Sequence, residues 1–91
     1  MGYTLEDAQE MHERYPETFE IPSELEILKL QVGDNVKLCF NNEERMWVEI
    51  IQIESKDCII GALNNDPVRI DGIRYGSIIE FSHRNIYSIL H

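Results

Sequence analysis

The sequence predicts an α+β domain in which a helical arm precedes a five-stranded antiparallel sheet, and three observations carry this prediction. The same sequence pattern occurs twice, in residues 30–38 and 73–81, each time with a glycine ahead of an alternating apolar run. Glycine permits the tight backbone turn that such a strand start requires. Further alternating runs, separated by turn residues, lie between and after the two copies. An apolar stripe at helical spacing precedes them all.

The arm is predicted over residues 1–29. Thr4 is expected to cap a helix over about 4–15, because its hydroxyl can accept from the N–H groups of the first turn. One face of that helix is apolar, formed by Leu5, Ala8, Met11 and Tyr15. Ser23 and Glu26 have the spacing of a capping box, which predicts a short helix over about 24–28. We expect the apolar face to dock on the protein's own sheet; docking on a second copy, which would give a homodimer instead of a monomer, is the alternative.

The sheet is predicted over residues 30–91, with strands at about 36–40, 45–54, 58–63, 77–81 and 86–89. The apolar pattern slips at Ile51, which predicts a β-bulge or a strong bend. Gly61 predicts a close backbone approach. A tight turn before the last strand, over 82–85, reads as one turn of 3₁₀ helix. Four short strands and one long, bent strand, together with this late turn, are typical of an SH3-like barrel. An OB-fold would carry a helix where the Pro- and Gly-broken stretch 64–76 offers none.

Three motifs in this region resemble those of a small bacterial domain-of-unknown-function family. They are Glu44–Val48 as E-x-x-W-V, Gly61–Pro67 as G-x-L-x-N-x-P, and Tyr75–Phe81 as Y-G-x-x-[IV]-x-F. The resemblance covers residues 30–90 and implies a small bacterial β-barrel without a known activity. The resemblance also implies an Asp directly after Gly76, where this sequence has Ser77, and this weakens any role built on a carboxylate there.

The chain of 91 residues is strongly acidic, with 17 Asp and Glu against 8 Lys and Arg and a net charge of −9. Eight acidic and two basic side chains give residues 1–31 a net charge of −6. Such a surface repels phosphate, so nucleic acid is a disfavoured partner and a basic protein a better one. Cys39 and Cys58 lack the spacing of a zinc site. No signal segment and no membrane-spanning run is evident, so we expect a cytoplasmic protein without cofactor or metal.

The candidate binding residues lie in one strand and the stretch that follows the third strand: Arg45, Trp47, Asn64, Asn65, Asp66 and Tyr75. An Arg–Trp pair beside a loop is a common binding anchor. Packing of Trp47 and Ile51 beneath the first helix is the favoured structural reading, since aromatic side chains dominate small cores. The polar cluster 64–66 is better explained by turn formation than by ligand binding, because Asx residues before proline bond to their own backbone.

These features predict a non-enzymatic interaction module, of which a toxin-neutralising or defence accessory protein is the more specific version. No catalytic residue can be named. The alternative is a small enzyme with a site in the 64–76 loop, which would require Asp66, Asp71 and His83 to share one pocket. A nucleic-acid-associated barrel is the third reading; it would require the basic side chains to gather on one face.

Overall fold

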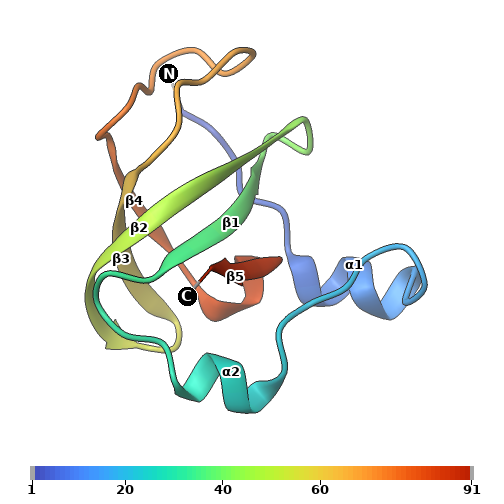
Figure 1. Ribbon diagram of the computed structural model, residues 1–91. Coiled ribbons are helices and arrows are strands. Elements are labelled where there is room, and N and C mark those ends of the chain that lie inside the picture. The colour runs from blue at the N-terminus through green and yellow to red at the C-terminus, as the bar shows by residue number, and fades with distance from the viewer. Residues whose placement is uncertain (1, 91) are drawn as a thin grey trace.

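The computed structural model describes residues 2–90, and it consists of one curled antiparallel sheet with short helices beside it (Figure 1). The elements in chain order are α1 (Ala8–Arg14), α2 (Glu24–Leu28), β1 (Asn35–Phe40), β2 (Glu44–Ser55), β3 (Cys58–Leu63), β4 (Ile78–Phe81), the 3₁₀ helix η1 (His83–Asn85) and β5 (Ser88–Leu90). The predicted α+β class, with two short N-terminal helices and five strands, is therefore confirmed.

The strands are ordered β4-β3-β2-β1-β5, and every pair of neighbours is antiparallel. Within residues 2–90 the outer edges of β4 and β5 pair with no other named strand, so the sheet is not closed into a barrel. The predicted closure is wrong because alternation identifies the strands but carries no information on which edges meet. The bulge is confirmed: the register of β2 against β3 shifts between Ile50 and Gln52, which leaves Ile51 as the extra residue.

The repeated sequence pattern, in residues 30–38 and 73–81, forms the same turn twice. Gly33 and Gly76 both have positive φ, at 99° and 89°. In the first copy the N–H of Gln31 donates to the Asp34 side chain, and in the second the N–H of Arg74 donates to the Ser77 hydroxyl. Each glycine N–H then donates to a neighbouring strand, at 2.9 Å and 2.7 Å. The two turns therefore start β1 and β4 by one mechanism, and a hydroxyl replaces the carboxylate in the second.

The core lies on the concave face of the sheet. Alternate residues of β1 and β2 point into it, including Val36, Leu38, Met46 and Val48, all at most 1% exposed. β3, β4 and the segment before β5 supply further core side chains: Ile59, Leu63, Ile79, Phe81 and Ile86. Burial of these aliphatic and aromatic groups supplies the main driving force for folding.

The first helix begins later than predicted, at Ala8, with Asp7 as its cap. Thr4 and Leu5 are extended instead, because the hairpin between β1 and β2 holds them. The N–H of Thr4 donates to the Asn41 side chain at 2.8 Å, and Leu5 forms a bridge with Phe40. The second helix and its capping box between Ser23 and Glu26 are present at the predicted bounds, Glu24–Leu28.

The apolar side of α1 packs against the outer face of the sheet. Ala8 is fully buried in a cluster with Cys39 and Tyr87, and Met11 and Phe19 pack against this cluster. The hydroxyl of Tyr87 donates to the Glu6 carboxylate. Tyr15, the last member of the predicted stripe, is 53% exposed, because it lies just past the end of the helix.

Candidate interaction face

The register places one row of side chains straight across the outer face of the sheet. Directly opposed residues in neighbouring strands share a face, so the row runs through Leu90, Asn35, Glu49, Ala62 and Ile78. Their sequence neighbours Val36 and Val48 are fully buried, which shows that the row faces away from the core. Ile78 is 62% exposed and Leu90 is 56% exposed, so both ends of the row present aliphatic groups to solvent.

Trp47 stands in the next row of this outer face. Its strand neighbour Lys37 places Nζ 4.8 Å from the centre of the indole ring. The ring is half-buried, and Ala62 lies on the diagonal position of β3, within reach of a large aromatic side chain. Helix α1 packs on Cys39 and Tyr87 instead of on Trp47, and Ile51 is 44% exposed. The favoured packing of Trp47 and Ile51 beneath the first helix is therefore wrong.

The loop after β3 fixes the backbone of Trp47. Its N–H donates to the Asn65 side chain, and its carbonyl accepts from the N–H of Asn64 at 2.8 Å. The Asn64 side chain in turn donates to Asn35 at 3.0 Å, which joins the loop to the outer face. Two of the three residues in the predicted 64–66 cluster therefore lie beside Trp47. They hold the strand and the loop in a single arrangement.

Arg45 is on the same face of β2 but serves a different contact. Its guanidinium carbon lies 4.7 Å from the ring centre of Tyr87 and 5.4 Å from that of Phe19. Phe19 lies at the end of the turn that follows α1, where its N–H donates to the Tyr15 carbonyl, so the cation bridges the arm and the sheet. Asp66 is exposed, and Tyr75 is 62% exposed. The six residues predicted as one site thus divide into a Trp47–Asn64–Asn65 cluster, an arm contact and two solvent-facing side chains.

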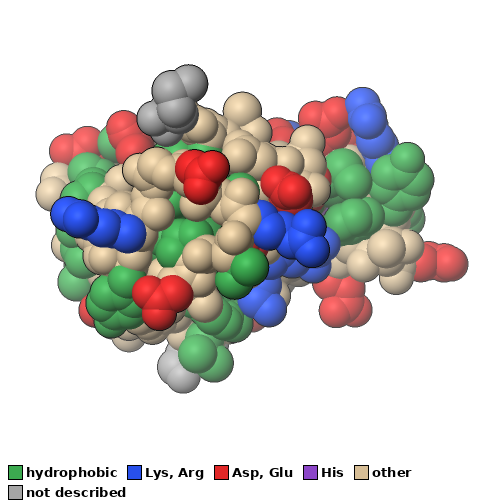
Figure 2. Space-filling model, turned by 90° about the horizontal axis from the view of Figure 1, so that it is seen from above, with side chains coloured by type: hydrophobic (Ala, Val, Ile, Leu, Met, Phe, Trp, Pro, Cys, Tyr) green, Lys and Arg blue, Asp and Glu red, His purple; other side chains and the backbone are tan. Residues whose placement is uncertain are grey.

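Glu44 holds the middle of the 64–76 loop. Its carboxylate accepts from the N–H groups of Val68 and Arg69 at 2.9 Å and 2.8 Å. These backbone hydrogen bonds lower the pKa of the Glu44 carboxyl. Figure 2 looks down on the end of the molecule that carries this loop, where acidic, basic and hydrophobic side chains lie among one another.

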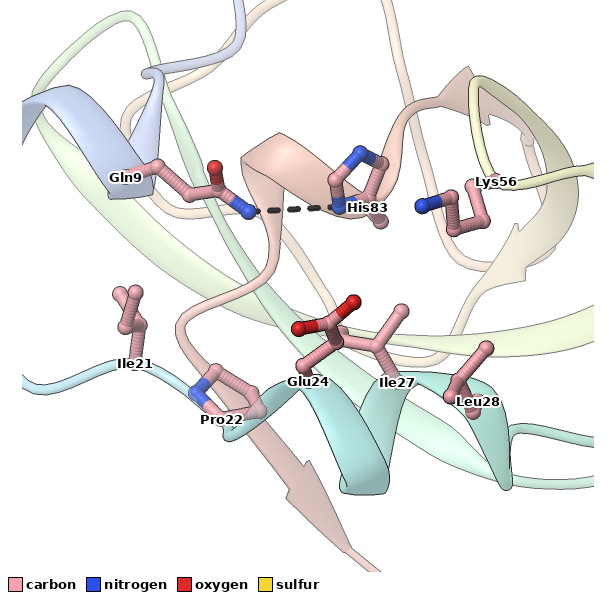
Figure 3. A pocket seen from close by; sticks show the side chains of 8 residues that line it. All are labelled: Gln9, Ile21, Pro22, Glu24, Ile27, Leu28, Lys56 and His83. Carbon is pink, nitrogen blue, oxygen red and sulfur yellow. Dashed lines mark hydrogen bonds between the residues drawn. The ribbon is translucent and has the colours of Figure 1, made fainter.

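A cavity of about 310 Å³ lies elsewhere, between α2 and the start of η1 (Figure 3). Its aliphatic side is formed by Ile21, Pro22, Ile27 and Leu28, and Gln9, Glu24, Lys56 and His83 supply polar groups. Sequence reasoning missed this site because its residues come from four segments that no periodicity connects. His83 lines the cavity without Asp66 or Asp71, so the pocket that the enzyme reading requires is not the one formed here.

The two thiols have raised pKa values. Burial, and then the charge of Glu6, raise the pKa of Cys39; a hydrogen bond from the Cys58 thiol to Glu54 raises the pKa of Cys58. A raised pKa disfavours the thiolate, which is the nucleophilic and metal-binding form of cysteine. Among residues 2–90, no group of three or more His, Cys, Asp or Glu side chains is arranged to hold a metal ion.

Comparison with known proteins adds no relative. No family model, no curated protein and no solved structure matches the chain. The expected resemblance to a small bacterial family finds no support in these comparisons. Within the part of the chain that the structure covers, no helix is both long and apolar enough to span a bilayer.

Proposed function

We propose that this protein is a non-enzymatic interaction module that binds another protein through the outer face of its sheet, centred on Trp47. The observation that supports this most directly is the fixed position of Trp47, with both backbone groups hydrogen-bonded and the ring half-buried on a face that also exposes Ile78. A rigid aromatic side chain ringed by aliphatic and polar groups is the usual centre of a protein interface. Preorganisation also reduces the ordering cost of association.

An SH3-like architecture is part of the same proposal. The sheet order β4-β3-β2-β1-β5 and the 3₁₀ turn just before the last strand are consistent with an open SH3-like sheet. In this arrangement α1 and Phe19 cover the part of the outer face around Cys39 and Tyr87, the part around Trp47 and Ile78 is left for a partner, and the concave face holds the core. The partner is a basic protein, because a net charge of −9 attracts basic surfaces and repels acidic ones. A toxin-neutralising or defence accessory role is the specific form of this proposal.

Photo-crosslinking identifies the partner and locates the surface together. A photoreactive residue at Ile78 samples the outer face, and one at Leu25, which is 59% exposed on α2, is the control. The expected result is one crosslinked protein from Ile78 that Leu25 does not give. A crosslink of equal yield from both positions would contradict the assignment of the face.

The purified partner then allows an equilibrium titration. Trp47→Ala is expected to weaken binding by about tenfold or more, and Asn65→Ala to weaken it less. Leu25→Ala, at an exposed position on α2, is expected to have no effect. Affinity should fall as salt rises, since charge attraction is screened. Unchanged affinity in folded Trp47→Ala and Asn65→Ala would refute the face, and affinity independent of salt would refute the basic partner.

A further inference from the structure

The cavity beside α2 contains two opposite charges without protein partners. Lys56 and Glu24 both line it, and neither side chain forms an ion pair or hydrogen bond with another described residue. Figure 3 shows the Lys56 ammonium and the Glu24 carboxylate directed into the same space from different segments. Aliphatic groups of Ile21, Ile27 and Leu28 lie beside them.

The remaining polar groups of the cavity, Gln9 and His83, already have protein partners. The Gln9 side-chain oxygen accepts from Arg84 at 3.0 Å, so its nitrogen faces His83 Nδ1 at 3.3 Å. An amide nitrogen can only donate, and Nδ1 is therefore the acceptor. The His83 proton then lies on Nε2, which is 3.6 Å from the Asp57 carboxylate. This assignment follows from the hydrogen-bond network and leaves no N–H of His83 directed at Gln9.

We propose that this cavity binds a free α-amino acid with an aliphatic side chain. Lys56 pairs with the α-carboxylate, Glu24 pairs with the α-ammonium, and the aliphatic wall receives the side chain. A plain carboxylate would meet the uncompensated charge of Glu24, and a plain amine would meet that of Lys56. A zwitterion satisfies both, so the charge pattern selects this class of ligand.

The size of the site agrees with a ligand of this class. Small-molecule sites span roughly 300–1,000 Å³, and about 310 Å³ is at the lower end of that range. A second hollow of about 150 Å³ shares Ile27, Leu28 and Lys56 with the cavity and continues toward Ile53 and Ile59. This extension gives a branched aliphatic side chain further apolar surface to cover.

A titration of the full chain followed by amide NMR tests the proposal, with L-leucine as the probe. Two analogues each lack one charge: 4-methylpentanoate has no ammonium, and 3-methylbutan-1-amine has no carboxylate. Leucine is expected to give saturable shifts at the amides of Lys56 and His83, and each analogue to bind about tenfold more weakly. Absence of saturable leucine shifts, or equal binding of the three compounds, would overturn the proposal.

Variants locate the binding in the cavity. Lys56→Met and Glu24→Gln are each expected to weaken leucine binding by about tenfold. Both side chains are exposed, so the fold should persist, and the amide spectrum of each variant verifies it. Lys29→Met and Glu13→Gln remove the same charges outside the cavity and should leave binding unchanged. Equal losses in the control variants, or saturable binding of a leucine-containing dipeptide but not of leucine, would overturn the assignment.

Discussion

At the scale of single residues, Gly61 has no room for a side chain. A Cβ at this position would lie 2.4 Å from a methyl carbon of Val48 and 2.7 Å from the carbonyl oxygen of Glu49. The second contact is with backbone, which cannot rotate away. We expect Gly61→Ala to lower the free energy of unfolding by about 1–3 kcal/mol, measured by urea denaturation.

Gly2 supplies the matched control for this substitution. A Cβ on Gly2 would have no heavy atom within 4 Å, so Gly2→Ala should leave the unfolding midpoint unchanged. A Gly61→Ala variant as stable as wild type would show that β2 and β3 can separate at this point without loss. The strand pairing around Ile50 would then be softer than the contacts indicate.

Asp7 combines two roles at one side chain. Its carboxylate accepts from the N–H of Glu10 as the cap of α1, and from Arg84 Nε at 2.9 Å. Although partial burial opposes it, the hydrogen bond from Arg84 and the backbone N–H groups lower the pKa of Asp7 below the ordinary 3.8. Ionised Asp7 therefore stabilises the fold above about pH 4. This contribution is lost as the pH falls through the lowered, folded-state pKa.

Two substitutions separate these roles. Asp7→Ala is expected to lower the free energy of unfolding at pH 7 by about 1 kcal/mol, while Asp7→Asn keeps the cap and loses only the pairing with Arg84. The loss of unfolding free energy caused by Asp7→Ala should become smaller below pH 4, as measured by urea denaturation at several pH values. A loss that stayed constant down to pH 2 would show that the charge of Asp7 contributes nothing.

At the scale of elements, the 64–76 loop has little regular structure but is tied at both ends. Asn64 and Asn65 hold its start to Trp47, and the N–H of Gly76 holds its end to the Leu63 carbonyl at 2.7 Å. Glu44 also holds its middle through Val68 and Arg69. A loop fixed in this way can support a binding face, because its ordering cost is met during folding.

Glu44→Ala should release the middle of this loop. The N–H groups of Val68 and Arg69 lose their acceptor, and their hydrogen exchange is expected to become faster while the strands keep their protection. Glu43→Ala is the control, since Glu43 lies beside the same loop but approaches only the Arg69 side chain, at 3.9 Å. Amide exchange by NMR measures both. Unchanged exchange in Glu44→Ala would show that the loop is held by its ends alone.

The elements also show where sequence reasoning succeeds. The repeated sequence pattern predicts two strand starts because a glycine and a short polar side chain build each turn locally. The slip at Ile51 predicts the bulge for the same reason, because the apolar alternation within a strand indicates which of its residues point to each face of the sheet. The start of α1 was misplaced because Thr4 is held by Asn41, a contact between residues 37 positions apart. Local preference cannot anticipate such a competitor.

At the scale of the whole molecule, the open sheet and the position of the cavity depend on contacts between distant segments. The cavity draws on Gln9, on α2, on Lys56 and on His83, and no spacing in the chain relates these residues. The candidate site was predictable only in part: Trp47 of β2 and the Asn64–Asn65 loop that follows β3 do lie side by side. Arg45 could not be separated from that group in advance, because its aromatic partner Phe19 comes from the arm.

Net charge is the property that belongs to the molecule as a whole. With 17 acidic and 8 basic side chains, most of the acidic excess lies on residues 1–31. The ion pair between Arg14 and Glu10 neutralises little of it. Like charges repel more strongly in the compact state than in the unfolded chain, so a net charge of −9 destabilises the fold at low ionic strength.

Salt should therefore stabilise this protein. The Debye length falls from about 30 Å at 0.01 M to about 8 Å at 0.15 M salt, and the repulsion among distant carboxylates is screened before the short contacts of Asp7 and Glu44 are. The urea midpoint at pH 7 is expected to rise over this range of sodium chloride. Replacing Glu13 and Glu17 by Gln should raise the midpoint at low salt and reduce the gain. A midpoint that falls as sodium chloride rises would mean that the specific ion pairs outweigh the repulsion, and that the acidic arm carries no cost to stability.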